Sequence, residues 1–527
     1  MKTVVLIILD GWGEGENNIA NPLVQAHIPA LRQIEKTYPR ILLAASGISV
    51  GLLWGEPGNS EAGHLNLGAG KIVYQYLPRI ILAIRDKSFF KNSAFVKAVG
   101  HVRQHNSRLH IMGLFSSGSV HSYADHLTAL LDFEKKNGLS DRTIVHIFTD
   151  GRDAPLKEGK TLVRELFERI KKERLGRFGS LMGRKYAMNR NAEWELTKTA
   201  YELLTEGKGA HIADPVAYLE SQYKKDITDE YIEPAIIEGG QTPLGGTVPP
   251  SVSDGDAVIF FNYREDSARQ LTKAFVLENF SEFPRKKIKN LFFATMTEYE
   301  KDLPVEIAFR PIKILNPLAK ILSDAGLRQL HVAETEKYAH ITYFFNGLKE
   351  KAFPGEDRVL VPSLIVKSFA QAPAMRTHDV SLKAVTALKL KRYSFILANF
   401  AASDMVAHTG DFHACTKAAE AIDEAIHAIK EAAERHRAAL IITSDHGNIE
   451  EMLDLTTGEI KTEHTIHPVP CFLIDESVRG RSLPNSGIRG GLTPLGLLAD
   501  VAPTILELLG LEKPEEMTGQ SLLRLLR

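Results

Sequence analysis

Short apolar runs recur along the chain, and they restrict the possible folds more than any other feature of the sequence. Each run is only a few residues long and is followed by a polar or glycine-containing turn. Runs of this length that are apolar throughout are typical of parallel strands buried on both faces of a sheet. The clearest of them lie at residues 4–9, 109–115, 145–148, 257–261, 291–294, 395–400 and 440–442.

Amphipathic patterns separate these runs. In residues 159–175, Leu162, Leu166 and Ile170 recur at helical spacing beside a charged face, and residues 414–438 show the same kind of pattern. Strands that alternate with helices favour parallel sheets covered by helices. We therefore predict an α/β protein.

Length and charge narrow the class further. Single hydrophobic cores stop growing at roughly 250–300 residues, so a chain of 527 residues predicts two domains. Lys and Arg number 64 against 65 Asp and Glu, and this balance argues against a nucleic acid or an anionic membrane surface as a partner. No apolar stretch approaches the about 20 residues that a membrane-spanning helix needs.

The N-terminus and the cysteines indicate a cytoplasmic protein. The apolar run at residues 4–9 is too short for a secretory signal, and Asp10-Gly11 follows it where a cleavage site would have small residues. We interpret this run as the first buried strand. With only Cys415 and Cys471, a disulfide framework is not expected, and the chain is typical of a reduced compartment.

Polar clusters follow several of the predicted strands. Asp10 comes directly after the first run, while Asp404 and Asp445 come just after the runs at 395–400 and 440–442. Because open parallel sheets bind ligands at the carboxyl ends of their strands, we expect these carboxylates to converge. Asp404 and His408 are four residues apart, so one helical turn would place both on the same face.

Together the clusters contain a nucleophile and a set of metal ligands. Ser60 lies in the segment Gly58-Asn59-Ser60-Glu61, about fifty residues after Asp10. A serine hydroxyl on a divalent cation loses its proton far more readily than a free serine, so it can attack phosphorus at neutral pH. A hydroxyl with several Asp and His ligands predicts a two-metal phosphoryl-transfer site. The candidate ligands are Asp10, Asp404, His408, Asp445, His446 and His464.

Each motif taken alone has a simpler interpretation. Asp10-Gly11 is typical of a turn, Asn59-Ser60-Glu61 of a helix N-cap, and Asp445-His446-Gly447-Asn448 of a polar loop. Their coincidence in α/β order favours the metal site. We expect His413 and His467 not to be ligands.

The middle of the chain carries different chemistry. Its polar residues are rich in arginine and lack obvious metal ligands, which predicts a separate domain inserted into the first. We place the metal-binding domain at residues 1–76 and 311–527 and the inserted domain at 77–310. Arginines are often surface residues in weak ion pairs, but they also bind carboxylate or phosphate through two bonds. The candidates here are His121, Arg152, Asp153, Arg184, Arg190 and Arg264.

The motifs match a known family in order along essentially the whole chain. The chain resembles the cofactor-independent (2,3-bisphosphoglycerate-independent) phosphoglycerate mutases of the alkaline phosphatase superfamily. The resemblance implies an alkaline-phosphatase-like domain with a second α/β domain inserted into it. The matching motifs include Leu9-Asp10-Gly11-Trp12-Gly13, Gly58-Asn59-Ser60-Glu61-Ala62-Gly63-His64, Asp150-Gly151-Arg152-Asp153, Phe261-Asn262-Tyr263-Arg264, Thr335-Glu336-Lys337-Tyr338-Ala339-His340, Asp404-Met405-Val406-Ala407-His408 and Asp445-His446-Gly447-Asn448.

The resemblance also implies a role for each candidate. Ser60 is the residue that is transiently phosphorylated, Lys337 sits beside it, and Asp153 shuttles protons to the glycerate hydroxyls. One Mn(II) is held by Asp404, His408 and His464, and the other by Asp10, Ser60, Asp445 and His446. The substrate-holding set is His121, Arg152, Asp153, Arg184, Arg190, Arg264 and Lys337. The implied reaction interconverts 2-phosphoglycerate and 3-phosphoglycerate in glycolysis, and we expect a monomer whose partner is this small substrate.

One departure from the family pattern concerns the substrate. Ser267 stands where the family has a second arginine, three residues after Arg264, so we expect weaker substrate binding. Two alternatives remain open. One is a related metal-dependent phosphatase or phosphomutase that acts on another acid, and the other is a catalytically inactive binding or scaffold protein. The retained nucleophile and ligand types argue against the second.

Overall fold

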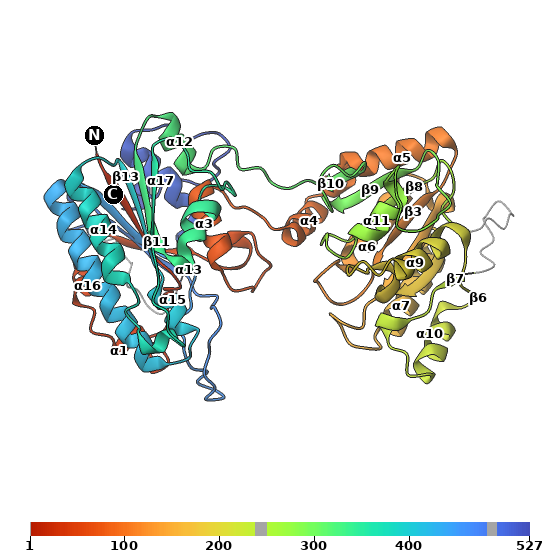
Figure 1. The fold of residues 1–527 in the computed structure, drawn as a ribbon, viewed down its shortest axis with the longest axis horizontal. Helices are drawn as coiled ribbons and strands as arrows, with labels where there is room; N and C mark the ends of the chain where they lie inside the picture. The colour runs from red at the N-terminus through yellow and green to blue at the C-terminus, as the bar shows by residue number, and fades with distance from the viewer. Residues whose placement is uncertain (1, 238–249, 482–492, 527) are drawn as a thin grey trace. The chain divides into compact units, whose positions relative to one another are not determined.

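Two compact units make up the chain (Figure 1). The computed structural model describes residues 2–237, 250–481 and 493–526. Unit 1 comprises Met1–Pro78 and Ile312–Arg527, and unit 2 comprises Arg79–Pro311. The boundaries expected from the sequence are 76/77 and 310/311, whereas the units divide after Pro78 and after Pro311.

Unit 1 is built on a mostly parallel sheet. The strands β12, β11, β13, β1 and β14 are neighbours in this order and run parallel, whereas β15 runs antiparallel to both β14 and β2. All six residues of β1 are buried, as expected for the first strand. Across the sheet the strands are β12 (Glu356–Val361), β11 (Gln329–Glu334), β13 (Phe395–Phe400), β1 (Val4–Leu9), β14 (Ala439–Thr443), β15 (Val469–Ile474), β2 (Arg40–Ala44) and β16 (Gly496–Leu497).

Helices cover the sheet of unit 1. The long helix α16 (Phe412–His436) corresponds to the amphipathic pattern predicted at 414–438, and it packs beside α14 (Thr377–Leu390) (Figure 1). Asp411 caps α16 by accepting a hydrogen bond from Ala414 N. The other α-helices are α1 (Pro22–Gln25), α2 (Pro29–Thr37), α3 (Ser60–Ala69), α12 (Leu318–Asp324), α13 (Thr335–Ala339), α15 (Ala402–Ala407), α17 (Val501–Leu509) and α18 (Leu523–Leu526).

Unit 2 has a similar sheet of its own. From β10 to β5 the neighbouring strands are parallel, and β7 is antiparallel to β5. The order is β10 (Glu306–Phe309), β9 (Phe292–Thr297), β8 (Ala257–Phe260), β3 (Leu109–Leu114), β4 (Thr143–Thr149), β5 (Arg177–Gly183), β7 (Ala235–Ile237) and β6 (Ala210–Ile212). The helices are α4 (Tyr76–Arg85, which begins before the unit boundary), α5 (Ser93–His105), α6 (Ala124–Lys136), α7 (Gly159–Glu173), α8 (Arg184–Ala187), α9 (Trp194–Glu206), α10 (Pro215–Lys224) and α11 (Arg269–Val276).

Every apolar run singled out in the sequence corresponds to a strand, and the predicted α/β class is confirmed. Several of the strands that we did not predict are less uniformly apolar. Strand β12 begins Glu356-Asp357-Arg358, and β2 alternates between buried and half-buried residues. The antiparallel direction of β15 is also unpredicted, because its sequence is as apolar as that of a parallel strand.

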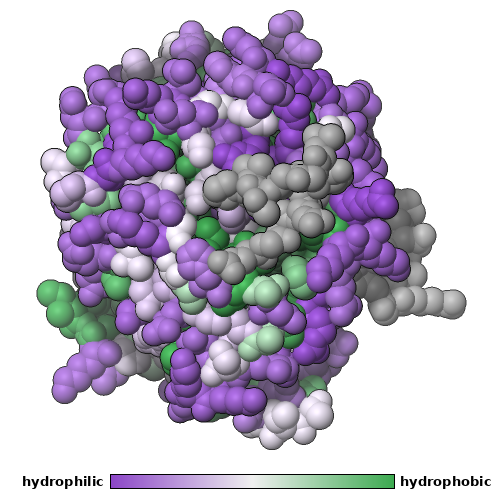
Figure 2. Space-filling view, turned by 90° about the vertical axis from the view of Figure 1, so that its right-hand side faces the viewer, coloured by the Kyte–Doolittle hydropathy of each residue, from purple (hydrophilic) through white to green (hydrophobic). Residues whose placement is uncertain are grey.

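The surface is charged and no membrane span is found. In the described parts of the chain, no helix is long and apolar enough to cross a bilayer. The face drawn in Figure 2 is dominated by hydrophilic residues with smaller hydrophobic areas between them.

One buried histidine gives unit 2 a pH-dependent stability. His126 lies in α6 with no exposed surface, between the rings of Tyr123 and Tyr263, and neither ring nitrogen has a hydrogen-bond partner. Burial lowers the pKa of His126 to about 3. The native protein therefore excludes a proton that the unfolded chain binds below about pH 6.5.

We predict that His126→Phe flattens the acid side of the stability profile. The free energy of unfolding should fall in the wild type as the pH drops below about 6.5, by about 2 kcal/mol at pH 5 from this residue alone. Urea unfolding at pH 7.5 and 5.0 measures the difference, and His211→Phe, at an exposed residue of the same unit, is the control. An unchanged pH dependence in His126→Phe would contradict the assignment.

Candidate active site

Four neighbouring parallel strands of unit 1 deliver polar side chains to one edge of its sheet. Asp10 follows β1, Asp404 lies in α15 after β13, Asp445 follows β14, and Lys337 lies in α13 after β11. Because the strands are parallel and Leu9 pairs with Phe400, their carboxyl ends coincide. The structure therefore brings together residues that are hundreds of positions apart in the chain.

The Lys337 ammonium lies at the centre of this group. Its Nζ is 2.6 Å from Asp10 Oδ1, 2.7 Å from Asp404 Oδ2 and 2.8 Å from Ser60 Oγ, and the side chain is buried. Burial opposes the charge, but Asp10, Asp404 and Asp445 outweigh it and raise the pKa of Lys337. Lys337 is therefore a cation that touches the candidate nucleophile directly.

The hydroxyl of Ser60 does not cap helix α3, because the neighbouring Asn59 provides the cap. The side chain of Asn59 accepts the hydrogen bond from Ala62 N at the start of α3, so Ser60 occupies the first helical position. Its Oγ lies 3.2 Å from Asp10 Oδ1 and 2.9 Å from His446 Nε2. The positive end of a helix also favours a phosphate at this place.

Two histidines present lone pairs to each other. His408 and His464 each place Nδ1 at 2.8 Å from a backbone carbonyl, of Thr462 and Gly58 respectively. A carbonyl only accepts, so each Nδ1 donates its proton, and in the neutral imidazole each Nε2 carries a lone pair. These Nε2 atoms are 3.2 Å apart and lie 3.3 and 3.4 Å from Asp404 Oδ1. Facing acceptors of this kind suit a bound cation.

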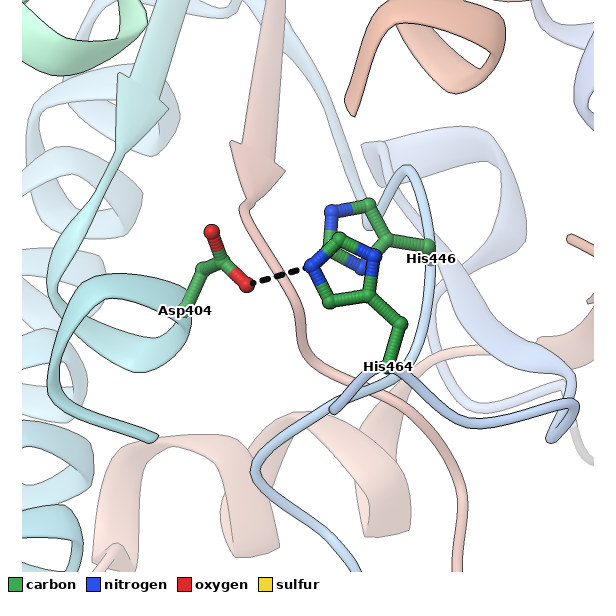
Figure 3. Close-up of side chains that lie close together, drawn as sticks. All are labelled: Asp404, His446 and His464. Carbon is green, nitrogen blue, oxygen red and sulfur yellow. Dashed lines mark ion pairs between the residues drawn. The ribbon is translucent and has the colours of Figure 1, made fainter. Parts of the chain in front are cut away.

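The ring of His446 stacks on that of His464, with centroids 4.0 Å apart, and Asp404 faces both (Figure 3). Within the described residues, the candidate metal groups by proximity are Asp404 with His446 and His464, and Asp10 with His64 and Asp445. The resemblance instead assigns His446 to the group of Asp10 and Asp445. His446 Nε2 lies 3.6 Å from Asp10 Oδ1 and 3.5 Å from Asp445 Oδ2, so it adjoins both groups.

The second group also has an unsatisfied ligand atom. Asp445 Oδ2 is buried and makes no hydrogen bond, although His64 Nδ1 lies 3.1 Å away. A buried carboxylate oxygen without a hydrogen bond is costly unless a cation meets it. The donor set of carboxylates, imidazoles and a hydroxyl therefore fits divalent metal ions.

The pKa values of the three carboxyl groups at the site shift in different directions. Burial acts to raise the pKa of Asp404 and Asp445, but Lys337 and nearby histidines overcome it and lower the pKa of both carboxyls. Burial and the Asp445 carboxylate raise the pKa of Asp10. Asp10, Asp404 and Asp445 thus crowd around the single ammonium of Lys337, and bound cations would relieve the repulsion among these acidic groups.

Several supporting residues escaped the sequence analysis. Asn399 Nδ2 donates to Asp10 Oδ2 at 2.7 Å, and Asn448 Nδ2 donates to Asp404 Oδ1 at 2.7 Å. His64 lies one helical turn after Ser60, and this spacing is the one signal that the sequence offered. His467 pairs with Glu451 instead, with Nε2 3.0 Å from Oε2.

Unit 2 repeats the arrangement with different chemistry. Four of its neighbouring parallel strands, β8, β3, β4 and β5, end next to the predicted anion-binding residues. Arg264 follows β8, His121 follows β3, Arg152 and Asp153 follow β4, and Arg184 follows β5. This cluster and the one in unit 1 each lie at the carboxyl ends of parallel strands.

Ion pairs between arginines and aspartates, together with close contacts to His121, link most of these residues in one chain. Arg184 contacts Asp153 at 2.5 Å, and His121 lies 3.6 Å from Asp153 and 3.5 Å from Asp266. Asp266 in turn contacts Arg190 and, at 3.1 Å, Arg264. Burial and the nearby Arg184 lower the pKa of His121 to about 4, so its imidazole is neutral. Arg152 stands apart, 59% exposed and 3.8 Å from Glu230.

Two acidic residues in this cluster were not predicted. Asp150 is buried and fixes Arg184 at 2.7 Å, while also accepting hydrogen bonds from Arg152 N and Asp153 N. Asp266 joins the two more exposed arginines to His121. Ser267 is buried, and its backbone N–H donates to Asp266 Oδ1. An arginine at position 267 would therefore require the surrounding loop to rearrange.

Comparisons with known proteins show which family the chain resembles. Residues 80–301 match the family model described as the BPG-independent PGAM N-terminus. The 2,3-bisphosphoglycerate-independent phosphoglycerate mutase of Moorella thermoacetica is 45% identical over 99% of this chain and 98% of its own length. The enzyme of the same name from Thermomicrobium roseum is 46% identical, with the same coverage of both chains.

A solved structure extends the likeness to three dimensions. The phosphoglycerate mutase of Leishmania mexicana, crystallised at low cobalt concentration, is 29% identical with a TM-score of 0.52 and covers 98% of this chain and 97% of its own. The resemblance and the fold expected from the motifs are therefore confirmed. The chain belongs to the 2,3-bisphosphoglycerate-independent phosphoglycerate mutases, a family of isomerases with an alkaline-phosphatase-like fold.

Proposed function

We propose that this protein interconverts 2-phosphoglycerate and 3-phosphoglycerate through a phosphoserine at Ser60, without a bisphosphoglycerate cofactor. The observation that carries the proposal is the environment of Ser60 Oγ. A buried lysine Nζ lies 2.8 Å from it, and two proposed metal-ligand atoms, His446 Nε2 and Asp10 Oδ1, lie 2.9 and 3.2 Å away.

In the proposed first step, Ser60 Oγ attacks phosphorus and the bond from phosphorus to the glycerate oxygen breaks. The serine proton passes to solvent, and the departing glycerate oxygen takes up a proton through Asp153, the proposed shuttle. The Lys337 ammonium and the N-terminus of α3 stabilise the negative charge on the phosphoryl oxygens. In the second step the other glycerate hydroxyl attacks the phosphoserine and restores Ser60.

Unit 2 supplies groups suited to the rest of the substrate. Arg184, Arg190 and Arg264 with His121 and Arg152 form the proposed site for the glycerate carboxylate and phosphate oxygens. Asp153, bonded to Arg184, is the proposed proton shuttle for the glycerate hydroxyls. The carboxylates of Asp153 and Asp266 keep these cations ordered before substrate binds.

Two divalent metal ions complete the proposed site, and Mn(II) is the expected metal. Asp404, His408 and His464 would hold one ion, and Asp10, Ser60, Asp445 and His446 the other. When bound, such ions neutralise phosphoryl oxygens and ease deprotonation of the serine hydroxyl. The substrate is a small anion, and we propose that the enzyme acts as a cytoplasmic monomer in glycolysis.

A metal-dependent phosphatase is the alternative, and its product distinguishes it. We predict that the wild type converts 3-phosphoglycerate to 2-phosphoglycerate in an enolase-coupled assay with Mn(II) and without added bisphosphoglycerate. Activity should be lost after metal removal with EDTA and return when Mn(II) is restored. Release of inorganic phosphate in place of 2-phosphoglycerate would show a hydrolase, and full activity in protein verified as metal-free would exclude the metal centre.

Ser60→Ala should abolish turnover while the protein stays folded. Alanine offers no oxygen to phosphorus, and the cap of α3 is unaffected because Asn59 provides it. Mutase activity measured beside circular dichroism and, for the wild type, trapping of phosphoserine by rapid acid quench test this prediction. Turnover at the wild-type rate in Ser60→Ala would end the covalent mechanism.

Lys337→Met should destabilise the metal-free protein. Without the ammonium, the buried carboxylates of Asp10 and Asp404 lose their cation, which costs about 3–5 kcal/mol when one partner of a buried pair is removed. Chemical unfolding in EDTA measures the loss in the free energy of unfolding. Added Mn(II) should make this loss smaller, because metal binding stabilises the native state.

The control is Lys320→Met, which removes a partly exposed partner of Asp324 within α12. Such surface pairs contribute about 0–1 kcal/mol. Equal losses in the two variants would show that Lys337 does not neutralise the site.

A further inference from the structure

A buried carboxylate outside the proposed ligand set joins the segments that carry the ligands. Glu450 is 1% exposed. Its Oε2 accepts hydrogen bonds from Gly13 N at 2.9 Å and from Asn448 N at 2.8 Å, and its Oε1 accepts one from the Thr465 hydroxyl. The donors are two backbone N–H groups and one hydroxyl, so the carboxylate is bound entirely by uncharged groups.

Each of these donors stands close to a proposed metal ligand. Gly13 lies three residues after Asp10, and Thr465 directly follows His464. Asn448 belongs to the loop that carries Asp445 and His446, and this loop also provides Glu450 itself. The segment of Gly13 is distant in the sequence from the other two, and residues 449–464 separate Asn448 from Thr465. Glu450 forms hydrogen bonds to all three segments.

The surrounding backbone is shaped to admit the Glu450 side chain. A Cβ atom at Gly13 would lie 2.3 Å from Glu450 Oε1, and one at Gly447 would lie 2.3 Å from the same oxygen. A Cβ at Gly15 would come within 2.9 Å of Glu450 Cγ. Real Cβ atoms do not approach other atoms this closely, so only glycine fits at these positions with the carboxylate in place.

The hydrogen bond between Thr465 and Glu450 affects the position of the neighbouring His464, which is a proposed metal ligand. The imidazole of His464 stacks on His446 at 4.0 Å and faces Asp404 Oδ1 at 3.4 Å. Its backbone is held by the Thr465 N–H bond to Gly447 O, at 3.0 Å, and its side chain by the bond to Gly58 O. Glu450 adds the side-chain connection from this segment to Gly13 and Asn448.

We propose that Glu450 is a positioning residue that holds His464 in register with Asp10, Asp445 and His446, through its bonds to Thr465, Gly13 and Asn448. The inference rests on the proposed metal centre and adds a residue that touches neither metal nor substrate. Side chains that orient metal ligands from outside the coordination sphere typically change metal affinity by 10–100-fold.

Thr465→Val separates His464 from Glu450 with little change in side-chain shape. The variant keeps both backbone bonds to Glu450 and leaves every proposed ligand intact. Thr465→Ser restores the hydroxyl and should restore function. Glu450→Gln should also be tolerated, because its amide oxygen can accept from Gly13 N and Asn448 N while its NH₂ group donates to the Thr465 oxygen.

Glu450→Ala removes all three bonds, and Glu356→Ala is the matched control. Glu356 is also a buried carboxylate of unit 1, bound by Asn346 Nδ2, Phe353 N and Arg358 Nε, but it lies in β12 and contacts none of the proposed ligands. Both alanine variants should be less stable in thermal unfolding, so lost stability alone does not separate them.

The measurement is a titration of each metal-free protein with Mn(II), in which electron paramagnetic resonance reports the free ion. We expect Thr465→Val and Glu450→Ala to bind one Mn(II) about 10-fold or more weakly than the wild type. Thr465→Ser, Glu450→Gln and Glu356→Ala should bind as the wild type does. The mutase activity of Thr465→Val should recover at high Mn(II) concentration.

Wild-type affinity in folded Thr465→Val would overturn the role of Glu450, and so would an equal loss of affinity in Glu356→Ala. If Glu450→Ala does not fold, the Thr465 pair decides the question alone. A wild type that binds no Mn(II) would instead overturn the proposed metal centre and this inference with it, and the two failures are therefore distinguished by the first titration.

Discussion

The parallel pairing of β1 with β13 and β14 is the constraint on which the active site depends. Val4 to Leu9 pair residue by residue with Phe395 to Phe400, and β14 pairs on the other side. Because parallel strands in this register end together, Asp10, Asp404 and Asp445 emerge side by side from three fully buried strands. A shift of one residue in either pairing would turn the side chains to the opposite face and separate the carboxylates.

The close approach of Asp10, Asp404 and Asp445 creates electrostatic repulsion, and other groups at the site reduce it. Lys337 neutralises part of the charge from within the protein, and it also touches the nucleophile. The repulsion among the acidic groups, the unbonded oxygen of Asp445 and the lone pairs that His408 and His464 carry as neutral imidazoles all favour bound cations. The same preorganised positive charge would stabilise a phosphoryl group in transit. In unit 2 the signs are reversed, since Asp150, Asp153 and Asp266 hold together a set of arginines, which are the proposed binding groups for an anion.

Loops and short helices carry the reactive groups, so their positions need support beyond the sheet. Asn59 takes over the capping of α3 and leaves Ser60 free, while backbone carbonyls fix the tautomers of His408 and His464. Glu450 plays a similar supporting role for whole backbone segments, through its hydrogen bonds to Gly13, Asn448 and Thr465. A carboxylate buried among glycines is an expensive feature for a fold to retain, and a role in aligning three ligand-bearing loops gives a physical reason for it.

The sequence by itself determined the α/β class, the principal strands, the helix α16 and the types of residue at the site, because hydrophobic periodicity and strand-end motifs are local properties. The spacing of Asp404 and His408 was sufficient to predict their common face. Other features depend on contacts between distant segments. The antiparallel direction of β15, the approach of Asn399 to Asp10 and the joining of Gly13, Asn448 and Thr465 by Glu450 leave no periodic signal in the chain. Only the tertiary structure decided them, because strand order, register and loop packing are set by the mutual fit of elements that the sequence lists far apart.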